Sequence, residues 1–126
     1  MFLLGNEANE ALRENRLDDA EHYHKTIIQY LQTQTLPEPE SEPKIAVGYH
    51  HLGMIAEERQ QFDEAEQWYR KALEIYDKIG HPPLKVDTLA QFGLLRIRQG
   101  RLHESVAWFA KAYGIASAYR LSLIHI

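Results

Sequence analysis

Seven histidines are the side chains in this chain that most readily suggest chemistry. Two pairs lie close together, His22 with His24 and His50 with His51. Two metal ligands on one helix must be three or four residues apart to face the same way. Neither pair has that spacing, and no HExxH motif occurs. We therefore expect surface or partly packed histidines without a metal or a cofactor, and a pH dependence of any contacts that His50 and His51 make.

The residue patterns of catalysis are also missing. The chain has no glycine-rich phosphate loop, no serine nucleophile motif and no carboxylate pair in a recognisable setting. It contains no cysteine, which excludes disulfides and thiolate chemistry and favours a reducing compartment. The acidic runs EERQ and DEAE are typical of solvated helix faces. The sequence therefore predicts a protein that is not an enzyme and has no catalytic residues.

Composition limits the partners. The 126 residues include 44% hydrophobic and 25% charged residues, as in a folded domain or a short run of repeats. The net charge of −4 and the lack of a basic stripe argue against nucleic acid. The apolar stretch at 2–4 is too short for a signal or a membrane span. We expect a cytoplasmic protein with no membrane contact.

Apolar residues recur every three or four positions along nearly the whole chain, and strand patterns are almost absent. The spacing predicts helices at 2–14, 18–33, 44–59, 63–79, 83–99 and 103–119. Asp18 and Asp63 are expected to cap helix starts, since a short carboxylate accepts the unpaired amides of a first turn. Gly80 fits a helix end, Pro82 and Pro83 a helix start, and Gly100 a tight turn.

The chain repeats itself. The segment QQFDEAEQWYRKALEIY at 60–76 aligns with GRLHESVAWFAKAYGIA at 100–116, so that Trp68 matches Trp108, and Gly53 matches Gly93 at the same offset. A weaker copy at 15–31 aligns at a larger offset. We predict a domain at 1–119 of three helix hairpins, at about 1–34, 44–80 and 83–119, with an acidic, proline-rich loop at 33–43. Small residues let the helices approach, and the tryptophans pack between hairpins.

These residues resemble the tetratricopeptide repeat (TPR) pattern. The central repeat carries it at Tyr49, Leu52, Gly53, Ala56, Ala65, Tyr69 and Ala72. The third repeat departs from it at Arg96, and the first, with Glu7 and His24, is degenerate. The 40-residue period is similar to the extended repeats of kinesin light chains and bacterial signalling proteins. The resemblance implies an all-α, right-handed α-solenoid of three antiparallel hairpins, whose concave wall holds a peptide or helix of another protein.

The resemblance also implies which residues line that groove. They come from the first helix of each hairpin: Asn6, Asn9, Arg13, His50, His51, Met54, Glu57, Glu58, Asp87, Gln91, Leu94 and Arg98. Some relatives grip a C-terminal carboxylate with Lys, Asn, Asn, Lys and Arg. Only Asn9 matches that clamp, and Asp87 would repel a carboxylate, so we do not expect chaperone-tail binding.

The C-terminal part raises the question of self-association. The last predicted helix has an apolar face with no polar helix to cover it, formed by Val106, Phe109, Tyr113 and Ala116. Such faces tend to associate. The tail at 120–126 either begins another helix or resembles translated adaptor sequence, in which case the chain is a fragment of a longer array. We expect an interaction module of a bacterial signalling protein, or alternatively a peptide-sensing regulatory domain.

Overall fold

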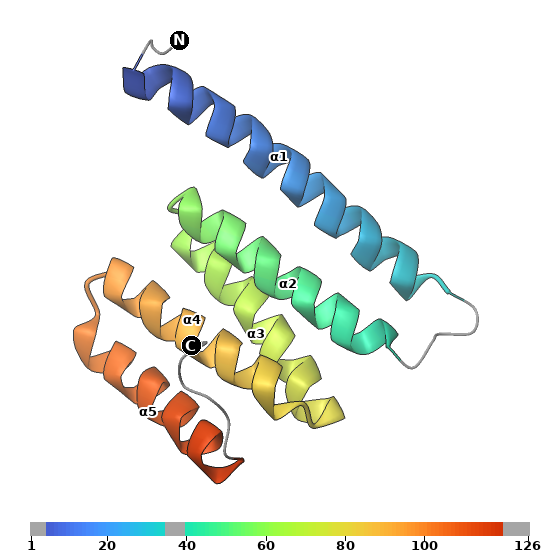
Figure 1. The fold of residues 1–126 in the computed structure, drawn as a ribbon, viewed down its shortest axis with the longest axis vertical. Helices are drawn as coiled ribbons and strands as arrows, with labels where there is room; N and C mark the ends of the chain where they lie inside the picture. Colours follow the sequence, from blue (N-terminus) through green and yellow to red (C-terminus); the bar gives the residue numbers. More distant parts are fainter. Residues whose placement is uncertain (1–4, 35–39, 120–126) are drawn as a thin grey trace.

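The computed structural model describes the backbone of residues 5–34 and 40–119, and the side chains from residue 13 onward within these ranges. The predicted tail at 120–126 and residues 35–39 of the predicted loop lie outside them. The described residues form helices and no strand: α1 (Gly5–Gln32), α2 (Ser41–Glu58), α3 (Phe62–Ile79), α4 (Pro82–Arg98) and α5 (Leu102–Ala118). Successive helices run antiparallel, side by side (Figure 1). The all-α repeat architecture is confirmed.

Helices α2 with α3 and α4 with α5 form two hairpins, and α4 also packs against α3. The apolar core is a series of small clusters between neighbouring helices. One cluster joins Ile28 of α1 to Leu52 of α2, and another joins Tyr69 of α3 to Phe92 of α4. Trp108 stacks on Phe92 with 3.9 Å between ring centres, but both residues belong to the α4–α5 hairpin, so this stack is packing within a hairpin and not the predicted packing between hairpins. Each helix is thus stable only against its neighbours.

The turns follow the predicted chemistry in most places. Gly80 ends α3 with a φ of 68°, and Gly100 turns between α4 and α5 with a φ of 75°, both in the left-handed region that glycine adopts without strain. Pro82 begins α4, where a missing amide costs nothing. The predicted cap at Asp63 is wrong, because α3 begins one residue earlier, after Gln61.

The start of α2 also differs from the prediction. Pro43, expected in the loop, lies in the first turn of α2, which begins at Ser41. A proline is tolerated there because the first-turn amides have no partner within the helix.

The first predicted hairpin is not formed. Residues 2–14 and 18–33 were expected to be separate helices, but α1 is one helix of 28 residues, and Asp18 lies inside it instead of capping a start. In the repeat alignment, Asn15 stands at the position of Gly100, where the last hairpin turns. The chain has no glycine or proline near Asn15 that would interrupt the helix.

Ion pairs with Arg59, which lies at the end of α2, stabilise the continuous helix. The guanidinium of Arg59 pairs with Glu14 at 3.1 Å, with Glu21 at 2.9 Å, and with Asp18. These three carboxylates share one face only when residues 14–21 are helical.

Within each hairpin the two helices touch at a glycine. A Cβ added to Gly53 would lie 2.4 Å from the ring of Tyr69, and one added to Gly93 would lie 2.8 Å from the ring of Phe109. Tyr69 is fully buried, whereas Phe109 is half-buried and has room to move. The two glycines occupy equivalent repeat positions, so close approach is a property of the repeat.

We predict that Gly53→Ala lowers the free energy of unfolding by about 2 kcal/mol, because overpacking against an immobile ring outweighs the better helix propensity of alanine. Gly93→Ala should cost less. Gly114→Ala, which meets nothing within 4 Å, should stabilise the protein by up to about 1 kcal/mol. Urea unfolding of the three variants measures this order. Equal costs at Gly53 and Gly114 would contradict the packing explanation.

Candidate functional site

The first helices of the two hairpins, α2 and α4, carry most of the predicted groove residues. We call the face they share the first-helix wall, defined by its described members His50, His51, Met54, Glu57, Glu58, Asp87, Gln91, Leu94 and Arg98. Met54 and Leu94 occupy equivalent positions and are 38% and 43% exposed. The wall therefore exposes two apolar side chains among polar groups.

A cavity of about 190 Å³ lies between α2 and α4 on this wall. It brings together three predicted site residues, His50, His51 and Asp87, with Thr88 on α4. The imidazole Nδ1 of His50 lies 2.8 Å from the hydroxyl of Thr88. This contact joins α2 to α4. The His50 ring also packs against the ring of Tyr69.

Burial lowers the pKa of His50 to about 4, and the charge of the adjacent His51 adds to this effect. The imidazole is therefore neutral between pH 5.5 and 8. The predicted pH dependence of contacts in that range cannot come from His50.

Glu57 is the centre of a hydrogen-bond network. Its side chain is 2% exposed, so it is not presented to a ligand. The hydroxyl of Tyr69 donates to Glu57 Oε1 at 2.7 Å, and the amide of Gln91 donates to the same oxygen at 3.2 Å. The guanidinium of Arg98 pairs with the other oxygen at 3.1 Å. One carboxylate thus links α2, α3 and α4 and fixes Arg98 at the wall.

The charges continue to α1 at the end of the wall. Glu58 lies 3.3 Å from Arg13 and 3.9 Å from Arg98. The ion pair with Glu58 therefore brings Arg13 beside the wall, and its contact with a partner stays a prediction. Asn6 and Asn9 belong to α1, but their side chains lie outside the described residues.

Comparison with known protein families identifies the helices from α2 to α5. The family described as tetratricopeptide repeat matches residues 44–118, which include nearly all of α2 through α5. The chain belongs to the tetratricopeptide repeat family. No curated protein and no solved structure matches the chain. TPR domains are interaction scaffolds that bind proteins or peptides, and the family carries no enzymatic activity of its own.

Sequence reasoning missed a larger cavity, of about 330 Å³, at the edge of the TPR hairpins. It lies between α1 and α2 and has mostly apolar walls, formed by Tyr23, His24, Ile27, Pro43, Lys44, Val47 and Gly48. The rings of His24 and His51 stack nearby with centres 4.7 Å apart. Tyr23 and Ile27 are four residues apart and so lie on one helix face, and this spacing was the sequence feature that could have predicted the cavity. We call this cavity the α1–α2 cavity.

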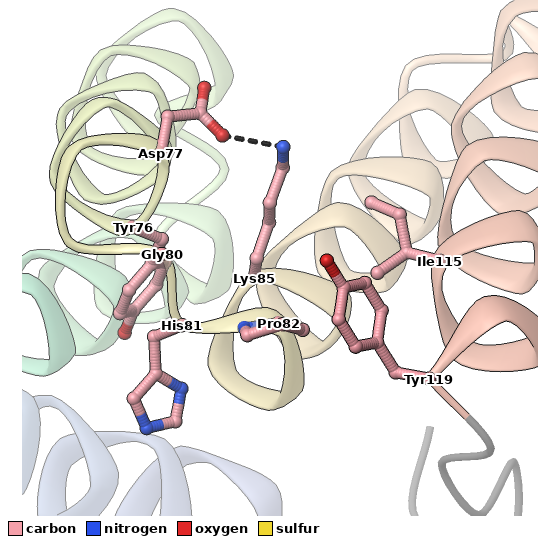
Figure 2. A pocket seen from close by; sticks show the side chains of 8 residues that line it. All are labelled: Tyr76, Asp77, Gly80, His81, Pro82, Lys85, Ile115 and Tyr119. Carbon is pink, nitrogen blue, oxygen red and sulfur yellow. Dashed lines mark ion pairs between the residues drawn. The ribbon is translucent and has the colours of Figure 1, made fainter.

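A third cavity, of about 200 Å³, lies where the turn between the two TPR hairpins meets the end of α5 (Figure 2). Asp77 and Lys85 pair across its rim at 2.5 Å. The Nδ1 atom of His81 accepts the amide of Leu84 and so caps α4. The charges here are matched within the protein, and we assign the cavity a structural role.

Among the described residues, no group of three or more histidine, aspartate or glutamate side chains is arranged to hold a metal ion. No helix in the described part of the chain is long and apolar enough to span a membrane.

We predict that the TPR domain loses stability as the pH falls from 6.5 towards 4. The pKa of His50 is lowered, so the unfolded chain takes up a proton in this range before the folded chain does. Between pH 6.5 and 5 the loss should be about 2 kcal/mol. Burial also lowers the pKa of His24 and adds to the effect. The hydrogen bond from Arg96 lowers the pKa of Glu66, so the stability that this carboxylate contributes is lost only below about pH 4.5.

The measurement is the urea midpoint at pH 7 and pH 5. His50→Gln, which retains a hydrogen-bonding group for Thr88, should flatten the profile. His103→Gln, on the exposed side of α5, is the matched control and should leave the slope unchanged. Equal slopes in both variants would show that His50 is not responsible.

Proposed function

We propose that this TPR domain is a non-enzymatic interaction module that binds a peptide or a helix of a partner protein along the first-helix wall. The observation that carries the proposal is the pair of exposed apolar side chains, Met54 and Leu94, at equivalent positions of α2 and α4. A partner with apolar residues at matching spacing would cover both. Hydrogen-bonding groups beside them would orient its backbone.

The wall is ordered before a partner arrives. The buried carboxylate of Glu57 holds Gln91 and Arg98, and these two side chains border Leu94 on α4. Side chains that are already fixed lose less conformational entropy on binding, which favours affinity. Arg98 remains about half exposed and can donate to an acceptor on the partner.

Two wider contexts fit this role. The 40-residue period favours a scaffold within a bacterial signalling protein, and the kinesin-light-chain-like resemblance stays a prediction. The alternative is a peptide-sensing regulatory domain. It is favoured by the bonds of His50 to Thr88 and of Gln91 to Glu57, because both cross from α2 to α4 and a ligand that displaced them would change the helix spacing.

The test uses peptides selected from a displayed random library on the immobilised domain. We expect the double variant Met54→Glu, Leu94→Glu to bind them at least tenfold more weakly, since two charges replace the apolar contacts. The control, Ala107→Glu with Ala110→Glu, adds the same charge to exposed positions of α5. Equal binding by both variants would place the site elsewhere. A thermal shift with short peptides alone would favour sensing over scaffolding.

We also propose self-association through α5. Of the predicted apolar face, Val106 and Tyr113 are exposed, and Val106 is 66% exposed. The prediction is wrong for Ala116, which is buried against α4, and Phe109 is only half-buried. Leu102 is also exposed on α5. The equivalent face of α3 is covered by α4. We therefore expect that a helix of a second copy can pack on this face of α5 in the same way.

Light scattering of the wild type should show a mass that rises with concentration. Val106→Asp should reduce that rise because a buried charge is costly. Ala107→Asp is the control, and a constant monomer mass for the wild type would exclude the interface.

A further inference from the structure

Within the described residues, the first repeat has no separate first helix, because α1 is continuous. In α3, the residues that face α2 are at most 1% exposed: Ala65, Tyr69, Ala72 and Tyr76. Their equivalents in α1 lie 45 positions earlier, and all remain partly exposed: Ala20, His24, Ile27 and Leu31. The α1–α2 cavity opens beside them. Helix α2 contacts one side of this face, where His24 stacks on His51, and among the described residues no second helix covers the other side.

The spacing of the repeat shows what fits there. In both complete hairpins a glycine lies sixteen positions before the aromatic ring that it touches, Gly53 before Tyr69 and Gly93 before Phe109. Sixteen positions before His24 stands Ala8, and Ala11 stands where the central repeat has Ala56. The sequence at 4–14 therefore carries the small residues that a first helix needs at its closest approach.

This segment cannot reach the cavity of its own chain. Because α1 is continuous, Ala8 and His24 are about 24 Å apart along the helix at 1.5 Å per residue. Arg59 holds the stretch between them in helical form through Glu14, Asp18 and Glu21. The small residues and the surface they fit are thus separated within one chain.

We propose that two copies exchange these segments. The N-terminal part of α1 of each copy lies in the α1–α2 cavity of the other, and the two α1 helices run antiparallel about a two-fold axis near Arg16. Such an exchange makes identical contacts on both copies and closes as a dimer. The register that places Ala8 on His24 also places Arg13 of one copy opposite Asp19 of the other. The two Arg16 side chains would meet near the axis, where their long, exposed stems let the guanidinium groups turn away from each other into solvent.

The exchange would complete the groove. Asn6 and Asn9 correspond to His51 and Met54 by the repeat alignment. In the dimer they would come from the second copy and lie beside α2. Each binding wall would then combine α2 and α4 of one chain with the start of α1 of the other, so dimerisation would precede full peptide affinity.

Disulfide trapping tests the exchange, since the wild-type chain has no cysteine. An Ala8→Cys chain is mixed with a His24→Cys chain at physiological salt and oxidised gently. We expect a covalent dimer in the mixture and little in either variant alone, because like positions are about 24 Å apart in this register. Ala8→Cys mixed with Glu104→Cys, on exposed α5, is the control and should not cross-link.

The double variant Ala8→Cys, His24→Cys separates exchange from an internal hairpin. Exchange yields a covalent dimer of twice 14.7 kDa on a non-reducing gel. An internal disulfide in a monomer would overturn the proposal. The absence of any cross-link would also overturn it, as would equal cross-linking in the Glu104→Cys control.

A turn-forming variant supplies a second measurement. Asn15→Gly puts glycine where Gly100 turns in the last hairpin, and should shift the mass in light scattering from dimer to monomer. Val106→Asp should leave the cross-link unchanged, which separates this dimer from association through α5. Cross-linking without any peptide binding would retain the exchange while excluding the proposed function.

Discussion

The close approach of the two helices in each hairpin is the constraint on which the rest of the structure depends. At Gly53 the backbone of α2 lies so near the ring of Tyr69 that a methyl group has no space. The ring is then buried between α2 and α4, where it also touches Phe92. A larger residue at this position would separate the helices, and the clusters that join the hairpins would lose their packing.

This packing has a consequence at the surface. Because Tyr69 is buried, its hydroxyl needs a partner, and Glu57 supplies it. The carboxylate in turn orders Gln91 and Arg98 on the next hairpin. Burial and the charge of Glu57 both raise the pKa of Tyr69, so it stays a neutral donor. A core contact thereby determines which polar groups stand on the first-helix wall and in what arrangement.

The sequence predicted which residues lie on the first helices of the hairpins, but it could not predict how exposed each side chain is. Met54 and Leu94 were expected on the wall and are exposed there. Glu57 was expected there too, yet it is buried, because sequence spacing gives the direction of a side chain and not the depth of its neighbours. The α1–α2 cavity was missed for a related reason. Tyr23 and Ile27 share a face, but only the absence of a covering helix among the described residues leaves it open.

The sequence by itself determined the repeat, the helix period and the glycines of the two complete hairpins, since these depend on local spacing and backbone freedom. Only the tertiary structure decided the form of the first repeat. Residues 14–18 include no glycine or proline that would end a helix. Their helix propensity is compatible with a turn between two helices or with one continuous helix. The contacts of Arg59 with three carboxylates favour the straight one. Those contacts exist only once α2 lies against α1.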